Sequence, residues 1–374
     1  LVAAGLTAAH AAALRAGADD TGPLLPLDHL FDLVLVLALF QLGTALGQRL
    51  LRWAGLDLGD PLDVLAFSTA VGLGVLATLV LGLGLVGGLH AWPMVGVMVV
   101  AAAVAWRELG TLPELLTRIP ASMRASGADT RWLAASWTVF ALIAVFLVCY
   151  GAVPPTDWDA LMYHLEVPAR FLQAGRVHLP PDNLHATVAG LMHMLYVPLL
   201  AAGSQAGPTL LNVLVTLLLG LTVFRMGSRV FGGDTGALAM ILLWGTTTIL
   251  LVTITPRTDV SVAFFLLLGH YAILRGFQAT RPSGDGGGDA NEPVDPVAWV
   301  ALGALVLGFA VGVKFNALAY AAVLAPVAVW ILVRSHAGAA GGARALLLWS
   351  ALGGVAMAPW LLKNLILVGA PFYP

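Results

Sequence analysis

Charged residues and cysteines are both scarce in this chain of 374 residues. Aspartate, glutamate, lysine and arginine make up only 10% of it, against about 25% in a typical soluble domain. Together with 59% hydrophobic residues and a mean hydropathy of +0.91, this excludes an ordinary soluble protein. The one cysteine, Cys149, lies in an apolar run, which excludes a disulfide framework or a cysteine-based metal site within the chain. The net charge of −2 gives no reason to expect a nucleic-acid partner.

Long apolar runs are what the chain has instead. Segments such as 134–153 and 209–224 are long enough to approach or cross a hydrocarbon core of about 30 Å. A transmembrane barrel would show alternating polarity rather than solid runs. The sequence therefore predicts an all-α polytopic membrane protein, with ten spans near 30–47, 62–88, 91–106, 134–153, 208–225, 236–254, 260–275, 297–313, 317–333 and 345–362.

The positions of lysine and arginine decide whether the ambiguous apolar segment 185–203 crosses the membrane. If it does not cross, twelve of the eighteen basic residues lie inside, as cytoplasmic loops prefer. If it crosses, the distribution becomes nine against nine. The first topology is therefore predicted. It places residues 154–207 outside as a re-entrant or surface-lying segment, puts both termini outside, and leaves six basic residues outside: Arg15, Arg170, Arg176, Arg257, Lys314 and Lys363.

Two further expectations concern the ends and the loops of the chain. It begins at Leu1 and stops at Pro374, so we expect both ends to be trimmed and a C-terminal part to be missing. No cleavable signal peptide is visible. The stretch 276–296 is rich in Gly, Pro and Asp, which predicts a flexible inner loop.

The segment 154–183 is unusually polar for this chain, with four carboxylates, two arginines and two histidines. Thr156 or Asp157 is suited to cap a short helix. Asp159, Tyr163 and Glu166 follow at i, i+4 and i+7, which places them on one helical face. A solvated surface helix would explain the pattern without any function. Charges at the edge of a bilayer are costly, however, and their concentration on one side of the membrane favours a site for an anionic ligand.

Other polar residues are predicted to lie on the same side. Asp259 opens the seventh span beside Arg257, either as a helix N-cap or as part of a site. Lys314 sits where two spans meet, either as a snorkelling lysine or as a cation for a phosphate. His185 and His193 are eight residues apart, which suits hydrogen-bonding residues at the interface better than a metal pair.

Four stretches together match a pattern. In DWDALMYHL (157–165), Asp159 and Tyr163 fit an Asp-Glu-x-x-Tyr signature, although Ala160 replaces the glutamate. Residues 212–259 form two apolar segments that lead to Asp259, and GFAVGVKFNAL (308–318) is a Gly-rich helix that ends in Lys314. PWLLKNLILVGAPFYP (359–374) fits a Trp-x-x-Arg-Asn…Gly-Asn-Pro-Phe-Tyr-Pro exit, with Lys363 for Arg and Ala370 for Asn.

In these motifs the chain resembles bacterial membrane glycosyltransferases of the GT-C fold. These are the family 39-like enzymes that include protein mannosyltransferase-like and aminoarabinose transferase-like proteins. The resemblance covers roughly residues 134–374 and implies a GT-C-like bundle whose long first outer loop carries surface-lying helices. Residues 1–133 then form an N-terminal addition of transmembrane helices and a cytoplasmic loop.

The resemblance implies an inverting transfer of a sugar from a polyprenyl phosphate to an acceptor hydroxyl at the extracytoplasmic face of the bacterial inner membrane. Asp159 is expected as general base, with Lys314 and Arg257, and thirdly Lys363, on the lipid phosphate. Further candidates orient the substrates or bind them: Asp259, Glu166, His164, Tyr163 and Tyr373. A divalent metal ion is an option, with Asp159, His185 and His193 as ligand candidates.

Two other classes of function stay open at this point. The chain could be a non-catalytic structural subunit of a membrane complex that descends from a transferase, which the loss of the glutamate at Ala160 favours. It could also be a lipid-linked transporter, although such a protein would favour charges at the middle of the bilayer. The sequence names neither the sugar nor the acceptor, which could be a glycan, a lipid or a protein.

Overall fold

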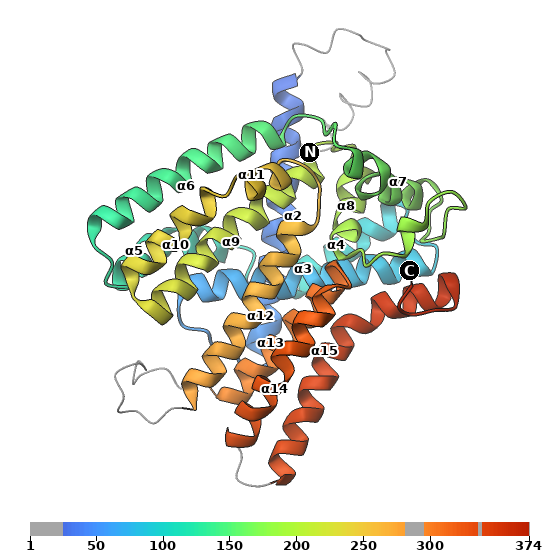
Figure 1. The fold of residues 1–374 in the computed structure, drawn as a ribbon. Coiled ribbons are helices and arrows are strands. Elements are labelled where there is room, and N and C mark those ends of the chain that lie inside the picture. The colour runs from blue at the N-terminus through green and yellow to red at the C-terminus, as the bar shows by residue number, and fades with distance from the viewer. Residues whose placement is uncertain (1–24, 281–294, 336–338, 374) are drawn as a thin grey trace.

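The computed structural model of the chain describes residues 25–280, 295–335 and 339–373, which contain helices and no strands (Figure 1). The predicted inner loop 276–296 falls largely on residues 281–294, outside these ranges. The helices are α2 (Leu25–Trp53), α3 (Pro61–Leu85), α4 (Ala91–Val104), α5 (Thr111–Ala125), α6 (Thr130–Gly151), η1 (Ala160–His164), α7 (Glu166–Gln173), η2 (Leu184–Thr187), α8 (Leu191–Ala201), α9 (Gly207–Phe231), α10 (Gly233–Trp244), α11 (Thr247–Thr253), α12 (Asp259–Ala279), α13 (Pro296–Val313), α14 (Ala317–Ser335) and α15 (Ala339–Val368).

The prediction of an all-α multi-pass membrane protein is confirmed. Within the described residues, eight helices are long and apolar enough to cross a membrane: α2, α3, α6, α9, α12, α13, α14 and α15. The pair α10 and α11 makes a ninth if its two parts, bent by 63°, form one broken span. Large apolar side chains such as Leu142 and Val145 of α6 are exposed, as expected for surfaces that face lipid.

The predicted number of ten spans is wrong. Residues 91–106 form α4, whose 14 residues extend only about 21 Å at 1.5 Å per residue, short of the hydrocarbon thickness. The segment 185–203 contains only the 11-residue α8, so the prediction that it does not form a full span is confirmed. Nearly all of α8 is buried within the protein, and the choice between a re-entrant and a surface-lying segment stays a prediction.

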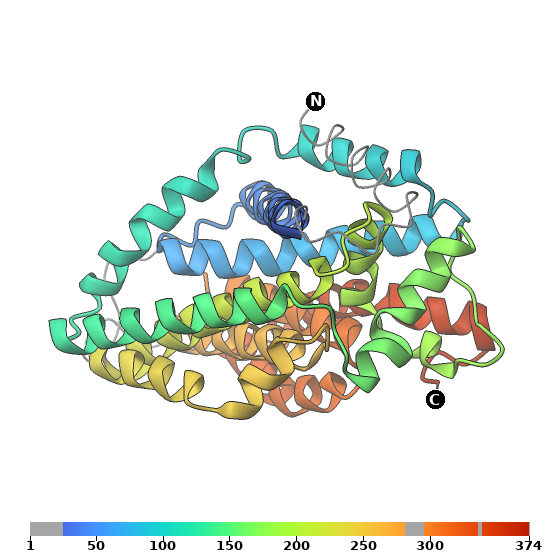
Figure 2. The same cartoon turned by 90° about the horizontal axis from the view of Figure 1, so that it is seen from above.

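Helix α3 lies in the middle of the molecule and contacts α2, α5, α8 and α9. Figure 2 shows α2 end-on where α3 lies lengthwise, so the two helices cross instead of running side by side. The crossing depends on glycines. A Cβ on Gly47 would meet the backbone oxygen of Ser68 at 1.8 Å, and one on Gly72 would meet that of Gly43 at 1.7 Å. Only glycine permits this backbone contact, as at other close helix crossings in membranes.

Gly72→Ala is therefore expected to destabilise the protein by about 1–3 kcal/mol, the usual cost of overpacking, because two backbones would have to separate. Thermal unfolding of the purified protein in detergent measures the effect. Gly82→Ala is the matched control, since a Cβ at Gly82 of the same helix meets nothing within 4 Å. Equal unfolding temperatures for the two variants would contradict the close crossing.

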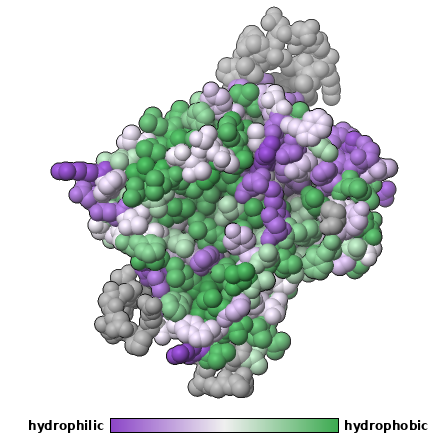
Figure 3. All heavy atoms as spheres, viewed as in Figure 1, coloured by the Kyte–Doolittle hydropathy of each residue, from purple (hydrophilic) through white to green (hydrophobic). Residues whose placement is uncertain are grey.

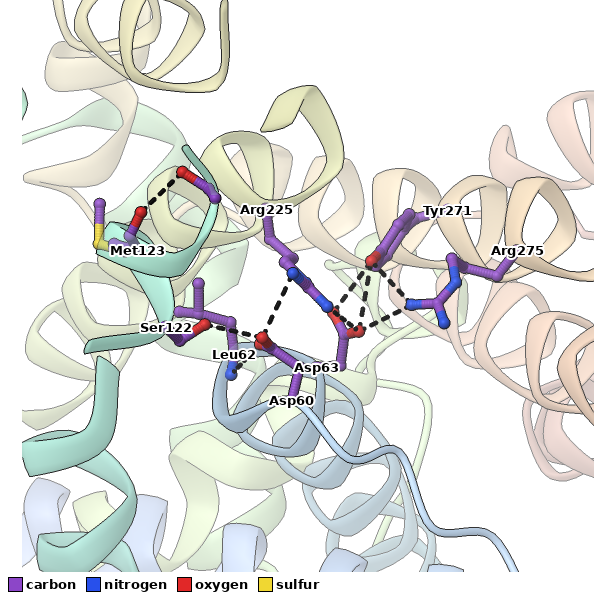
Figure 4. A network of polar contacts seen from close by, with 9 residues as sticks. Asp60, Leu62, Asp63, Ser122, Met123, Arg225, Tyr271 and Arg275 are labelled. Atoms are coloured by element: carbon purple, nitrogen blue, oxygen red, sulfur yellow. Dashed lines mark hydrogen bonds and ion pairs between the residues drawn. The ribbon is translucent and has the colours of Figure 1, made fainter. Parts of the chain in front are cut away.

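A buried ion-pair network joins α3 to α9 and α12 (Figure 4). Arg225 donates to both oxygens of Asp63, from Nε at 3.0 Å and Nη2 at 3.1 Å. Arg275 Nη1 donates to Asp63 Oδ2 at 2.9 Å, and the Tyr271 hydroxyl donates to Oδ1 at 3.0 Å. Asp60, at the N-cap of α3, also pairs with Arg225 at 3.2 Å.

The domain boundary predicted near residue 133 stays a prediction. One buried apolar cluster runs from Val36 of α2 and Phe67 of α3 to Phe309 of α13 and Trp360 of α15. The N-terminal helices therefore share a core with the rest of the described chain, and Asp63 supplies the carboxylate for arginines 162 and 212 residues away.

Candidate functional site

Five charged residues from three distant parts of the chain form the polar cluster: Asp157, Asp159, Arg257, Asp259 and Lys314. Arg257 holds Asp157 with two hydrogen bonds, from Nε at 2.9 Å and Nη2 at 2.5 Å. Its Nη1 lies 3.3 Å from Asp159 Oδ2. Lys314 Nζ donates to Asp259 Oδ1 at 2.6 Å. The sequence predicted that Asp159, Arg257, Asp259 and Lys314 would lie on one side of the molecule. The structure pairs Asp159 with Arg257 and Asp259 with Lys314. The two pairs are linked through Arg257, whose pKa is raised first by Asp157 and also by the charges of Asp159 and Asp259.

Local backbone features set the position of each member. Asp157 caps the short helical turn that follows, since its Oδ2 accepts from the N–H of Ala160 at 3.2 Å. Of the two predicted caps, Thr156 and Asp157, the structure therefore uses Asp157. Arg257 lies in the connection between α11 and α12, and Lys314 is the C-cap of α13 with extended dihedral angles of φ −146° and ψ 133°. The chain leaves α13 at Lys314, so the side chain can point toward the start of α12.

Of the two alternatives for Asp259, the helix N-cap is wrong. The N-cap of α12 is Thr258, and Asp259 is the first helical residue. A carboxylate in the first turn is stabilised by the positive end of the helix dipole. Because the Asp259 side chain is not needed for a cap, it is available to Lys314.

The prediction that Asp159, Tyr163 and Glu166 lie on one face of a regular helix is wrong. Residues Ala160–His164 form a π-helical turn, closed by a hydrogen bond from Leu165 N–H to Ala160 O at 2.9 Å. The wider turn changes the angular spacing, and such π turns are frequent at functional sites. Asp159 therefore precedes the turn, Tyr163 lies within it, and Glu166 is the first residue of α7.

Glu166 belongs to a separate ion-pair group on the surface. Its Oε1 accepts from Arg170 Nε at 2.6 Å, and Arg170 Nη1 donates to Asp182 at 2.6 Å. The i,i+4 pair of Glu166 and Arg170 thus forms although Pro168 lies between them. These hydrogen bonds raise the pKa of Arg170 and lower that of Asp182. Within the described residues, no contact joins Glu166 to the polar cluster, so this residue lacks the position that its predicted role requires.

In Figure 3 hydrophilic residues gather over α7 and the neighbouring loops, on a face that is otherwise largely hydrophobic.

Four aromatic rings pack beside the polar cluster. Tyr163 stacks on His185, with ring centroids 4.5 Å apart and planes at 14°, and lies 4.1 Å from the ring of His164. His164 Nδ1 is 2.9 Å from His193 Nε2, a hydrogen bond that joins the π turn to α8. Burial is the main cause that raises the pKa of Tyr163, and Asp159 and Asp259 add to it.

The histidine pair is buried and uncharged at neutral pH. Burial, followed by the positive charges of Lys314 and Arg257, lowers the pKa of His164 to about 3. Burial also holds the pKa of His193 well below its ordinary value, with His164 and Lys363 adding to the effect. A neutral pair can form one N–H···N hydrogen bond, with either ring as donor.

The stability of the protein is expected to fall as the pH falls from about 6.5 toward about 3. In that window the unfolded chain binds protons at these histidines and the folded chain does not. For His164 the free energy of unfolding then falls by about 1.4 kcal/mol per pH unit. Above about pH 6.5 this contribution is constant. Denaturation of wild type and His164→Gln across this range measures the slope, with His178→Gln as the control that removes a surface histidine. An unchanged slope in His164→Gln would contradict the neutral buried pair.

The residues proposed as metal ligands do not converge. His193 is occupied by His164, and His185 Nδ1 lies 3.2 Å from Asn183 Oδ1. No group of three His, Cys, Asp or Glu residues that could hold a metal ion occurs in residues 25–280, 295–335 and 339–373. Asp159, His185 and His193 therefore do not form a common ligand set.

Lys363 is not available as a phosphate-binding cation. Its side chain is 2% exposed, and Nζ donates to the backbone oxygens of Ala186 at 2.8 Å and Val188 at 2.6 Å. Its neighbour Asn364 donates to Tyr373 O at 2.9 Å, which folds the end of the described chain back on α15. Lys363, expected outside, is thus buried together with Asn364, and Lys363 attaches α15 to the segment before α8.

Asp159 is the carboxylate of the polar cluster with the longest contact to a cation. Its side chain is 38% exposed, and its ion pair among the described residues is the 3.3 Å contact to Arg257. Asp259 is 48% exposed but is held by Lys314 at 2.6 Å. Asp157 is held by two shorter hydrogen bonds, which are the first cause that lowers its pKa. The polar cluster thus contains one loosely held proton acceptor, Asp159, and two cations, Arg257 and Lys314, that are already paired with carboxylates.

Two features of the site were missed by sequence reasoning. Asp157 was seen only as a cap, although its main partner is Arg257, 100 residues away. The pair of His164 and His193, 29 residues apart, was not foreseen because no local pattern links a π turn to a separate helix. The sequence offered one indirect sign of this pair, namely polar residues in 154–183 and histidines in the apolar segment 185–203.

Comparisons with protein-family models, with curated proteins and with solved structures give no match to this chain. The resemblance to GT-C glycosyltransferases therefore rests on the four sequence stretches alone.

Proposed function

We propose that the chain is an integral membrane glycosyltransferase that moves a sugar from a polyprenyl phosphate to an acceptor hydroxyl. The observation that carries this proposal is Asp159, a partly exposed carboxylate with a 3.3 Å contact to Arg257, in the same polar cluster as the pair of Lys314 and Asp259. A general base has to be reachable by the hydroxyl that it deprotonates, and its charge has to be stabilised only loosely. Asp159 meets both conditions better than Asp157.

In the proposed reaction Asp159 accepts the proton of the acceptor hydroxyl as its oxygen attacks the anomeric carbon. The bond from that carbon to the phosphate oxygen breaks, and the negative charge that develops on the lipid phosphate needs nearby cations. Lys314 is the better placed of the two, because one hydrogen bond to the 48% exposed Asp259 holds it, whereas three contacts to Asp157 and Asp159 hold Arg257. Arg257 is held by Asp157 and acts mainly to position Asp159.

The remaining candidate residues take supporting roles in this proposal. Tyr163 lies between Asp159 and the histidine rings and would contact the substrate, whereas buried His164 positions the π turn through His193. Glu166 and Lys363 are assigned no part in the chemistry. A divalent ion is not needed for this reaction. The acceptor, a glycan, a lipid or a protein, would approach from the extracytoplasmic side of the bacterial inner membrane.

The proposal is tested with the full chain in lipid vesicles. A panel of polyprenyl-phosphate sugars labelled in the sugar is offered together with candidate acceptors, and the transferred label and the free polyprenyl phosphate are measured. Release of polyprenyl phosphate that depends on Asp159 would support the transferase. Absence of turnover over the panel, with intact binding of the donor, would support the second candidate.

That second candidate is a structural subunit of a membrane complex that has lost catalysis. Two observations favour it. Both cations of the polar cluster are already paired with carboxylates, so a phosphate would have to compete for them. Ala160 also stands where the resembled signature has a glutamate. Co-purification of stoichiometric partner proteins from native membranes would favour this alternative over the enzyme.

A further inference from the structure

A groove of about 660 Å³ lies between α2, α4 and α8, away from the polar cluster. Its volume is within the range of about 300–1,000 Å³ that small-molecule sites occupy. The helices that form it belong to the part of the chain before the resembled motifs, apart from α8. Nothing in the proposed transfer reaction uses this groove.

The groove is long and narrow. Helix α4 contributes residues at i, i+3, i+4, i+7, i+8 and i+11, which form one face over three turns: Ala91, Met94, Val95, Met98, Val99 and Ala102. At 1.5 Å per residue this face extends about 16 Å. The opposite wall follows α2 from Leu35 to Leu42, and the end of α8 at Pro198–Ala202 completes it. Such a shape suits an extended chain better than a compact ring.

The lining is almost wholly apolar. Gln41 has the one polar side chain among the lining residues, and its Nε2 already donates to the backbone oxygen of Leu109. The groove has room for many waters, yet each buried water needs 2–4 polar partners. Water therefore cannot fill it favourably, and an empty space of this size would forfeit the dispersion contacts of its walls.

The groove opens to the outside along one edge of α4. Val95 and Val99 line the groove and are 50% and 59% exposed. Trp92 and Trp106, at the two ends of this helix, are exposed as well, and tryptophan is enriched at the boundaries of bilayers. Since the protein is a multi-pass membrane protein, hydrocarbon chains are the apolar molecules that adjoin this opening.

We propose that one acyl chain of a membrane phospholipid fills the groove between α2, α4 and α8. The chain would replace missing side-chain contacts and hold α4, which is too short to cross the membrane, at its distance from α2. It would also press on the C-terminal end of α8, whose N-terminal half carries His193. The proposal does not depend on the transferase, because none of the lining residues belongs to the polar cluster.

The test uses two adjacent alanines of α4 in the full chain. Ala102 lines the groove, whereas Ala103 is exposed on another face and does not line it. Wild type, Ala102→Phe and Ala103→Phe are purified in mild detergent from vesicles that contain phosphatidylglycerol, phosphatidylethanolamine and undecaprenyl phosphate. Native mass spectrometry then measures the retained lipid. Ala38→Leu, which enters the groove from α2, provides a second variant if Ala102→Phe does not fold.

Wild type and Ala103→Phe are expected to retain phospholipid, and the groove-filling variants are expected to retain about tenfold less, which corresponds to about 1.4 kcal/mol. Added phospholipid should raise the unfolding temperature of wild type and Ala103→Phe more than that of Ala102→Phe. Retention of undecaprenyl phosphate in place of phospholipid would overturn the assignment of the occupant. Equal phospholipid retention by Ala102→Phe and Ala103→Phe, or none by wild type, would overturn the site.

Discussion

Asp159→Asn is expected to lower the rate of sugar transfer by about 10²–10⁴-fold, the usual contribution of a general base. The amide has nearly the shape of the carboxylate but cannot accept a proton at neutral pH. The loss should appear in kcat rather than in donor binding, since the phosphate is assigned to Lys314 and not to Asp159. Single-turnover transfer from a labelled polyprenyl-phosphate sugar measures the chemical step directly.

Asp182→Asn is the matched control for this prediction. Asp182 is a carboxylate of the same polar segment 154–183, paired with Arg170 and largely exposed, and lies outside the polar cluster. Its loss should leave transfer within a few-fold of wild type, because surface ion pairs contribute little. Near-normal turnover of Asp159→Asn would remove the base assignment. Equal losses in both variants would point to a general disturbance of the segment instead.

Asp63→Asn is expected to destabilise the protein by about 3–5 kcal/mol, the cost of breaking a buried ion pair from one side. Asp63 is 1% exposed and accepts from Arg225, Arg275 and Tyr271. Without its negative charge the two guanidinium groups, which lie close to the same carboxylate, would repel each other. Thermal or denaturant unfolding in detergent measures the loss, with transfer or lipid binding as a readout of the remaining fold.

A double variant separates charge from shape. Arg225→Gln added to Asp63→Asn removes one excess positive charge, so part of the stability should return, as expected for residues that contact each other. Asp57→Asn is the control, because Asp57 is exposed just before α3 and bonds only locally to the N–H of Gly59. Additive effects of the two substitutions would contradict the network.

Local features of the polar segment 154–183 were readable from the sequence. Asp157 was one of two predicted caps, and the pair of Glu166 and Arg170 follows from their i,i+4 spacing. The π turn between them was not readable, because it depends on how Tyr163 and His164 pack against His185 and His193 from the next helices. That packing changed the predicted common face of Asp159, Tyr163 and Glu166.

The roles of the basic residues show the same division. Lys314 was predicted beside Asp259 on one side of the membrane, and the structure pairs them at 2.6 Å. Lys363 was predicted there too, but two backbone oxygens of residues 177 and 175 positions earlier hold its ammonium group. A sequence shows that a lysine needs partners, but not which carbonyl groups a distant segment will present.

The sequence by itself determined that this protein is helical, multi-pass and polar at one group of loops. Apolar length and hydrogen bonding within each helix are local properties, and a helix in lipid satisfies its own backbone. The tertiary structure alone decided that Asp63 pairs with Arg225 and Arg275, that α2 crosses α3 at glycines, and that α4 stands off to leave a groove. These outcomes depend on which surfaces fit together across long stretches of chain, and apolar helices that all suit lipid equally well carry little information about that choice.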